Sequence, residues 1–517
     1  MENKEKKVLL QISNLKQYFP TGKKGLSVKA NDGISIDIYE GETFGLVGES
    51  GCGKSTLGRS ILQLYKQTDG RTMYFGRSIE EVAPSYALAT YSTLDKRKAK
   101  MHVLQKKYED FKAEYDALPE REQYAKHAEL TRLKKEANDA VLDMATLIGG
   151  LLAAEDMNEI SRIFIEEYKI SRELHNAIME REDVQLDVDD AQFELKEADE
   201  KKRESKKAAL NKATARLKKC DDKIAGIRAR IDEVRHRIDQ LRDKHRNDPD
   251  FELYEAHRST GIDLARLNYD EMRRLRSDLQ LIFQDPYSSL NPRMTVGQII
   301  GEGMIAHKFF RSTGARMQEE VIRVMEECGL APYFLHRYPH QFSGGQRQRI
   351  GIARSLALRP KFVVCDEAVS ALDVSIQAQV INLLLELKEK QNLTYMFITH
   401  DLSVVKYISD RIGVMYLGNM VELAPSDDIF AHPLHPYTNA LLKAIPTTDP
   451  NANKHPEILE GDIPSPVRPP KGCKFHTRCK YCTEICTQVV PEWRELRPNH
   501  FVACHHVLEE GNKAEAK

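Results

Sequence analysis

The segment GESGCGKST at 48–56 could bind the phosphates of a nucleoside triphosphate. It fits the spacing G-x-x-x-x-G-K-[ST], in which the backbone amides of a glycine-rich loop surround the β-phosphate. Lys54 can reach the β and γ oxygens, and Ser55 can coordinate Mg²⁺. The apolar run TFGLV precedes the segment and the run STLGRSIL follows it, which is the strand–loop–helix context that such a loop requires. We expect nucleotide contacts from Gly48, Glu49, Ser50, Gly51, Cys52, Gly53, Lys54, Ser55 and Thr56.

A second segment, FVVCDE at 362–367, supplies the acidic groups that hydrolysis requires. Asp366 suits Mg²⁺, and Glu367 can polarise the attacking water. Two other apolar runs end in polar residues. Gln284, in LIFQDP, could contact Mg²⁺ or the water, and His400, in MFITHD, could contact the γ-phosphate. A lone histidine at such a position is more often a structural group.

A third segment could bind an anion, although it contains no lysine. In QFSGGQRQR at 341–349, Ser343, Gly344, Gly345 and Gln346 open a run that looks helical. Because the first amides of a helix have no intrahelical hydrogen-bond partner, the start of this helix is a favourable binding site for a phosphate. Shortly after the two carboxylates, the segment SALD offers Asp373 as a contact across a subunit boundary.

The elements that carry these residues lie in two stretches with strand-and-turn patterning, separated by a long charged stretch. We expect four segments, at 1–76, 77–260, 261–425 and 426–517. The second is helical by period, with an apolar seam at Ile224, Ile227, Ile231, Val234, Ile238 and Leu241. Pro119, Gly149–Gly150 and Pro249 are the expected breaks. Since the chain must return to its starting point, we expect an antiparallel helical hairpin; a solvated charged spacer is the alternative.

Composition narrows the class of protein. Lysine and arginine nearly balance aspartate and glutamate, for a formal charge of −1, so we expect no nucleic-acid partner. The sequence has neither a membrane-spanning apolar run nor a signal peptide, and we expect a soluble cytoplasmic protein. Five of the nine cysteines fall between Cys473 and Cys504, and that crowding suggests metal ligation before disulfides.

The ordered motifs GESGCGKST, Gln284, SGGQ, CDE, SALD and ITHD resemble the ATP-binding cassette (ABC) ATPases. The resemblance implies an α/β P-loop cassette with a RecA-like core and a helical subdomain. It also implies that two cassettes pair head to tail, with ATP between the P-loop of one and the SGGQ segment of the other. Phe19 would stack on adenine, with Tyr18 as the second candidate. Phe342 stands where the family more often has leucine.

Three further segments resemble the oligopeptide/dipeptide importer ATP-binding subunits of the F type: FQDPYSSLNPRMTVGQII, SALDVSIQAQVINLL and PLHPYTNALLKAIP. The resemblance implies ATP and Mg²⁺ as cofactors. Its implied partners are a second ATPase subunit in a heterodimer, two membrane permeases and, indirectly, an external peptide-binding protein. The chain would lie peripherally at the cytoplasmic membrane face. Nickel import and DNA maintenance are the alternatives. The insertion at 77–260 departs from the family.

The cysteine-rich segment matches the C-terminal module of the same family. There the resemblance implies a [4Fe–4S] cluster on Cys473, Cys479, Cys486 and Cys504. Thiolates suit iron–sulfur clusters and Zn²⁺ equally, so a zinc site that uses Cys482 or His476 is the competing interpretation. We expect a structural or regulatory role for either.

Overall fold

The computed structural model describes residues 6–23, 25–370, 372–444 and 461–508. The chain divides into two compact units. The first comprises Met1–Tyr74, Asp263–Ala265 and Met272–Lys517, and the second comprises Phe75–Ile262 and Arg266–Glu271. The insertion expected at 77–260 falls within the second unit, whereas 426–517 is not separated from the first. Parts of the expected segments 1–76 and 426–517 lie outside the described residues.

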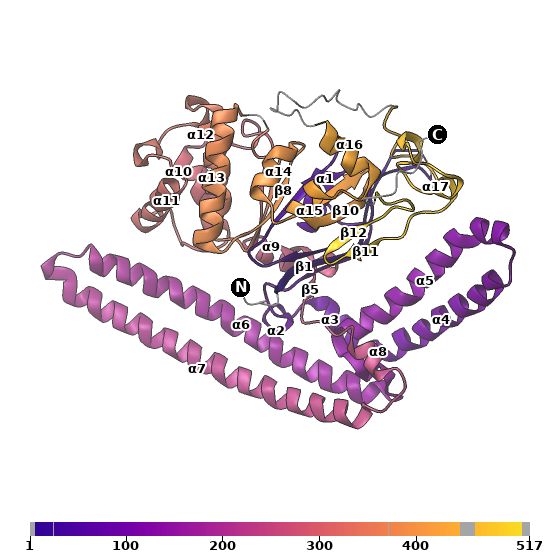
Figure 1. The fold of residues 1–517 in the computed structure, drawn as a ribbon. Helices are drawn as coiled ribbons and strands as arrows, with labels where there is room; N and C mark the ends of the chain where they lie inside the picture. Colours follow the sequence, from indigo (N-terminus) through magenta and orange to yellow (C-terminus); the bar gives the residue numbers. More distant parts are fainter. Residues whose placement is uncertain (1–5, 24, 371, 445–460, 509–517) are drawn as a thin grey trace. The chain divides into compact units, whose positions relative to one another are not determined.

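Within the described residues, an eight-stranded sheet runs through the first unit in the order β11-β12-β10-β9-β3-β8-β7-β6 (Figure 1). Strands β9, β3, β8, β7 and β6 are parallel, and the other three continue antiparallel. The bounds are β3 Thr43–Val47, β6 Leu279–Ile282, β7 Phe362–Asp366, β8 Thr394–Ile398, β9 Arg411–Tyr416, β10 Asn419–Pro425, β11 Arg494–Arg497 and β12 His500–Val502. The parallel strands are short, apolar and almost wholly buried, as expected for a sheet that helices cover on both faces.

The parallel strands bring the candidate residues to one edge. Parallel strands end at the same side of a sheet, which is where α/β proteins bind ligands. The P-loop follows β3, Gln284 follows β6, Glu367 follows β7, and His400 follows β8. The sheet therefore gathers groups that lie hundreds of residues apart in sequence.

A second, antiparallel sheet carries the strand with Phe19. Strand β1 (Val8–Pro20) pairs with β2 (Ser27–Tyr39) and with β4 (Asp69–Tyr74). The short strand β5 (Ile262–Asp263) and helix α9 (Tyr269–Leu275) lie where the chain passes from one unit to the other.

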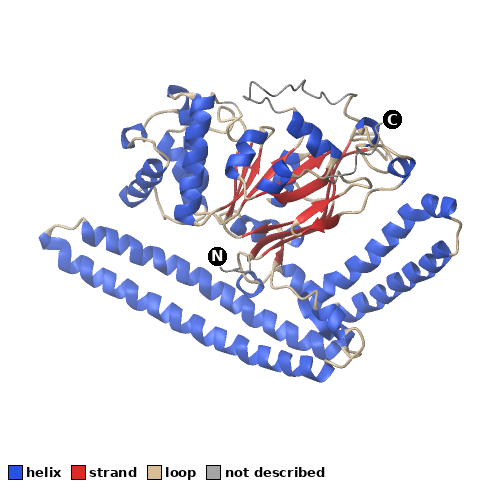
Figure 2. Cartoon of the chain, in the orientation of Figure 1, coloured by secondary structure: helices blue, strands red, loops and turns tan. Residues whose placement is uncertain are grey.

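Helices pack on the large sheet, and α10 to α13 form a separate helical part of the first unit (Figures 1 and 2). Their apolar sides share one core with β6, β7 and β8. The bounds are α1 Lys54–Ile61, α10 Val296–Ala306, α11 Ala315–Glu327, α12 Gly344–Leu356, α13 Val374–Gln391, α14 Leu402–Ile408, α15 Ser426–Ala431, α16 Pro436–Lys443 and α17 Glu484–Gln488. Short 3₁₀ turns occur at Leu264–Arg266, Pro332–Phe334, Pro339–Gln341 and His476–Arg478.

The second unit is built of helices. Their bounds are α2 Ile79–Val82, α3 Ser85–Tyr91, α4 Leu94–Asp116, α5 Glu120–Ile148, α6 Met157–Lys196, α7 Glu200–His245 and α8 Phe251–Glu255, with a 3₁₀ turn at Gly149–Ala153. Helix α7 has 46 residues, which is about 70 Å at about 1.5 Å per residue.

Helices α6 and α7 form an antiparallel pair. The seam residues from Ile224 to Ile238 are buried on α7. Ion pairs between α6 and α7 flank the seam. As the residue number on α6 rises from pair to pair, the residue number on α7 falls, as expected for antiparallel helices. The pairs are Glu159–Lys244, Glu166–Arg237, Glu173–Arg230, Glu180–Lys223, Asp187–Arg216 and Glu194–Lys206. The α6 members recur every seven residues, a repeat typical of coiled coils. Exposed pairs contribute little stability, but each of these six joins an acidic side chain of α6 to a basic side chain of α7.

The insertion contains two antiparallel helix pairs where the sequence analysis expected one. Helices α4 and α5 form the other pair (Figure 1). The expected breaks at Pro119 and Gly149 are present. The turn between α6 and α7, at 197–199, has neither glycine nor proline, so the rules for breaks in a helix gave no signal there.

We expect Ile231→Ala to destabilise the α6–α7 pair. Ile231 is buried in its core, and truncating a buried isoleucine removes apolar contacts and leaves a cavity. The free energy of opening of α7 amides in hydrogen exchange should fall by about 2–4 kcal/mol. Arg228→Ala, an exposed change one turn away, is the control. Equal protection of the α7 amides against exchange in the two variants would show that Ile231 does not stabilise the seam.

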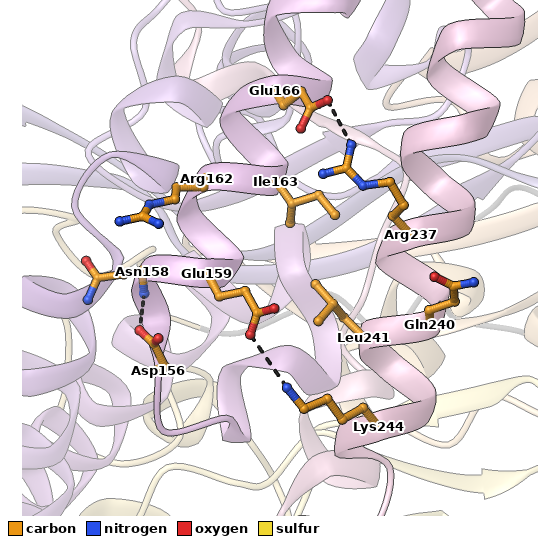
Figure 3. A pocket seen from close by; sticks show the side chains of 10 residues that line it. All are labelled: Asp156, Asn158, Glu159, Arg162, Ile163, Glu166, Arg237, Gln240, Leu241 and Lys244. Atoms are coloured by element: carbon orange, nitrogen blue, oxygen red, sulfur yellow. Dashed lines mark hydrogen bonds and ion pairs between the residues drawn. The ribbon is translucent and has the colours of Figure 1, made fainter.

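A charged hollow lies on the second unit between α6 and α7 (Figure 3). Ion pairs Glu159–Lys244 and Glu166–Arg237 cross it at 3.7 and 2.9 Å, and Asp156 accepts the Asn158 amide at the start of α6. Its charged groups are largely matched with each other, so we assign it no ligand.

Candidate functional site

The P-loop has the backbone that a phosphate cradle needs. It connects the buried strand β3 to α1, and Gly48, Gly51 and Gly53 all have positive φ. A Cβ at Gly53 would lie 2.1 Å from the carbonyl oxygen of Ala30. Only glycine fits there, because both the conformation and the space exclude a side chain.

Lys54 and Ser55 lie at the start of α1, where Lys54 contacts the loop backbone and Ser55 contacts Asp366. Lys54 Nζ donates to the carbonyl oxygens of Gly48 at 2.7 Å and Glu49 at 3.1 Å, so the ammonium lies inside the loop. Ser55 Oγ donates to Asp366 Oδ1 at 2.5 Å. The two expected magnesium ligands are thus neighbours, although 311 residues separate them.

Arg59 is part of this cluster and was missed by the sequence analysis. Its Nη2 lies 3.1 Å from Asp366 Oδ2, and the Asp366 side chain is 1% exposed. A buried carboxylate needs a counter-charge, and Arg59 supplies it from one turn along α1. Its place one turn beyond Ser55 on the helix was the only available signal.

Glu367 lies between Gln284 and His400. Gln284 Nε2 donates to Glu367 Oε2 at 2.6 Å, and His400 Nδ1 is 3.5 Å from Glu367 Oε1. Glu367 has a φ of 46°, in the left-handed region that non-glycine residues rarely adopt. The turn after β7 holds it there, with its amide bonded to the Ile398 carbonyl. This convergence can orient a water beside the γ-phosphate.

Tyr18 and Phe19 occupy different environments on β1. The Phe19 ring packs edge-on against Tyr65 with centroids 5.3 Å apart. The Tyr18 hydroxyl donates to Asp32, and Lys29 lies over its ring. Phe19 as the adenine platform remains a prediction, because both rings already have protein contacts.

The SGGQ segment forms the N-terminus of α12. Ser343 caps the helix, and the Gln346 side-chain oxygen accepts a hydrogen bond from the Ser343 amide. A Cβ at Gly345 would lie 2.4 Å from Ile376 Cγ2 on α13. Figure 1 places α12 well apart from α1 within the first unit, so the structure does not bring this chain's SGGQ to its own P-loop. Asp373 caps α13 by accepting a hydrogen bond from the Ile376 amide at 3.0 Å, and Ala371, two residues earlier, lies outside the described residues.

Four of the five clustered cysteines line one small cavity, and they are Cys473, Cys479, Cys486 and Cys504. Cys482 is exposed and is not among the lining residues. Burial, reinforced by the neighbouring thiols, raises the pKa of Cys479 to about 11 and that of Cys504 to about 12. Among the described residues, however, no three His, Cys, Asp or Glu side chains are arranged as a metal-binding group.

In the part of the chain that the structure describes, no helix is both long enough and apolar enough to cross a membrane.

Two family descriptions match the chain. "ABC transporter" matches residues 31–203 and 253–370, and "Oligopeptide/dipeptide transporter, C-terminal region" matches 421–486. Both agree with the resemblance drawn from the motifs.

The chain is similar to proteins named for oligopeptide transport. The oligopeptide transport ATP-binding protein AppF of Bacillus subtilis is 53% identical over 248 residues, 47% of this chain and 75% of AppF. The putative oligopeptide transport ATP-binding protein YkfD of the same species is 35% identical over 499 residues, 96% of this chain and 95% of YkfD. Among solved structures, the dimeric bacterial ABC transporter cassette MJ0796 is 15% identical, with a TM-score of 0.42, over 81% of this chain and 99% of that one.

Proposed function

Because the chain belongs to the ABC transporter family, we propose that it is the ATP-hydrolysing subunit of an importer for oligopeptides and dipeptides. The observation that carries the cargo class is the match of residues 421–486 to the C-terminal region of oligopeptide/dipeptide transporters. The names of AppF and YkfD support the same class. Nickel import by similar machinery and a role in DNA maintenance are less well supported, since AppF and YkfD are both named for oligopeptide transport.

We propose a role in hydrolysis for each residue, and the geometry supports it. Lys54 and the loop amides would hold the β- and γ-phosphates, and Ser55 with Asp366 would hold Mg²⁺. Glu367 would take the proton of the attacking water, while Gln284 and His400 fix its carboxylate.

A second cassette would complete the site. Since α12 and α1 lie apart in one chain, the SGGQ amides and the helix dipole can act on the γ-phosphate bound by a partner. Hydrolysis would then be coupled to closing and opening of the pair. We propose that the partners are a second, different ATP-binding subunit and two membrane permeases, with an external peptide-binding protein acting indirectly. The chain would lie at the cytoplasmic face of the membrane.

Peptide uptake tests this proposal. Cells that lack the gene should lose uptake of labelled di- to pentapeptides, and the wild-type gene should restore it. The tagged chain should also co-purify with two integral membrane permeases and another ATP-binding subunit from detergent-solubilised membranes. Unchanged peptide uptake, with loss of nickel uptake instead, would contradict the cargo class.

We further infer that the cysteine-lined cavity holds a [4Fe–4S] cluster. Beyond the four thiols, four histidines are among the residues that line the cavity: His435, His476, His505 and His506. The His435 side chain is almost fully buried, its Nδ1 accepts the Tyr437 amide, and its Nε2 has no hydrogen-bond partner among the described residues. An unpaired buried donor next to four thiols fits a sulfur-rich occupant. Binding would require the thiol side chains to move closer together. The four bonds from sulfur to iron would then link the loops of the module.

Metal content is the direct test of this inference. Anaerobically purified protein should be brown and contain about four irons per chain, and Cys479→Ser should lose them. Cys482→Ser is the matched control and should keep them, because Cys482 lies outside the cavity lining. A colourless protein with one zinc ion would show that the competing interpretation holds.

A further inference from the structure

The C-terminal module contacts the P-loop directly through a bidentate ion pair. Arg478 Nη1 lies 2.8 Å from Glu49 Oε2, and Arg478 Nη2 lies 3.0 Å from Glu49 Oε1. The Arg478 side chain is 5% exposed and that of Glu49 is 22% exposed. Two parallel charge-assisted hydrogen bonds fix both the position and the plane of the carboxylate. Because the pair is mostly covered, salt screens it less than a surface pair.

The same P-loop residue is held through its backbone. The Glu49 amide donates to the phenol oxygen of Tyr437 at 2.9 Å. Tyr437 is fully buried and packs against the rings of Tyr416 and Phe475 at 4.8 and 5.3 Å. The PLHPYT segment therefore helps to hold the P-loop, because its tyrosine, Tyr437, accepts a hydrogen bond from the loop backbone.

A third contact reaches the strand beside the candidate adenine platform. Lys474 Nζ lies 3.1 Å from Asp32 Oδ2 and 3.1 Å from the Leu417 carbonyl oxygen. Asp32 also accepts the Tyr18 hydroxyl, and Tyr18 is the neighbour of Phe19 on β1. The short segment from Lys474 to Arg478 thus holds groups on both the phosphate side and the adenine side of the expected nucleotide position.

These contacts have a consequence for nucleotide affinity. A glycine-rich loop loses much conformational entropy when it closes on a phosphate. Contacts that hold the loop before the nucleotide arrives lower that cost, and the gain is seen as tighter binding. The Arg478–Glu49 contact lies at the loop's second residue and not at the γ-phosphate, so it should act equally on the ground state and the transition state.

We propose that Arg478 is a positioning residue for ATP binding, acting through the Glu49 side chain to hold the P-loop in its phosphate-binding form. This rests on the proposed function in one respect, that the P-loop binds ATP. The C-terminal module is therefore part of the nucleotide site of this chain and not only an appendage for partners.

The test is to compare Arg478→Met with the wild-type full-length chain. The Kd for MgATP, from titration calorimetry, should rise about tenfold, which corresponds to about 1.4 kcal/mol. In the assembled ATPase, KM should rise by the same factor, and kcat at saturating ATP should stay within about twofold. A merely structural role would instead lower kcat, or the fraction of active protein, without raising Kd. Arg497→Met, an exposed arginine of the same module, is the matched control and should leave Kd unchanged.

Glu49→Gln tests the same contact from the loop side and keeps the backbone amide that Tyr437 binds. It should raise Kd about as much as Arg478→Met, and the double variant should be no worse than Arg478→Met alone, because both changes remove the same ion pair. If Kd is unchanged in both single variants, or if their effects multiply in the double variant, the proposal is wrong. If the wild-type chain binds no ATP, both the proposed function and this inference are wrong. If the wild-type chain binds ATP and Arg478→Met binds it equally well, only this inference is wrong.

Discussion

Replacing Glu367 by glutamine should slow ATP hydrolysis about a thousandfold and leave the Kd for MgATP within about twofold of the wild-type value. Glutamine has the same shape and can still accept the hydrogen bond from Gln284, but it cannot take a proton from water. Nucleotide should therefore bind, close the paired cassettes and remain unhydrolysed. Phosphate release by the assembled ATPase and the amount of trapped ATP are the two measurements.

Glu389→Gln is the matched control for this prediction, because it changes an exposed glutamate on α13. That variant should hydrolyse ATP at the wild-type rate. Undiminished turnover by Glu367→Gln would show that another group accepts the proton, and His400, 3.5 Å from the Glu367 carboxylate, would be the next candidate.

Ser343→Arg should greatly slow hydrolysis at the partner's P-loop and spare ATP binding by the chain that carries the change. Arginine would remove the cap of α12 and fill the space in front of the free helix amides. Losing such donors costs about a hundredfold to a thousandfold in rate. Because α12 and α1 lie apart in this chain, its own P-loop should still bind MgATP with the wild-type Kd.

The measurement requires the two nucleotide sites to be distinguished. A photoreactive ATP analogue can label each subunit of the assembled pair, and single-turnover hydrolysis is then followed at each site. Ser312→Arg places the same side chain at an exposed loop position and should affect neither site. Equal loss at both sites, or loss of this chain's own binding, would contradict the arrangement in which SGGQ acts on the partner.

Much of the candidate site could be predicted from the sequence because each part is local. A P-loop is one strand, one turn and one helix in succession, so nine consecutive residues specify it. The carboxylates of β7 follow a buried apolar run for the same reason. Their meeting with Gln284 and His400 also follows from a simple rule, since parallel strands end at one edge of a sheet. The family, expected from these motifs, is confirmed by the matches.

The insertion was predicted in kind but not in detail. Periodicity gave the seam on α7, because buried positions recur every three or four residues on one helix. It did not give the turn at 197–199 or the second helix pair, since that turn carries no glycine or proline. The chain reverses there, and the ion pairs Glu194–Lys206 and Asp187–Arg216 join the two helices beyond the turn.

What the sequence alone determined is the set of motifs whose chemistry is contained in neighbouring residues: the phosphate loop, the paired carboxylates, the SGGQ helix start and the crowding of cysteines. Only the tertiary structure decided which distant side chains support them. Arg59 beside Asp366, Arg478 on Glu49, Tyr437 at the loop amide and the exclusion of Cys482 from the cavity all join positions with no local signature. An ordinary arginine or tyrosine gains its role from what the fold packs against it. That information lies in the packing of elements and not in any short stretch of the chain.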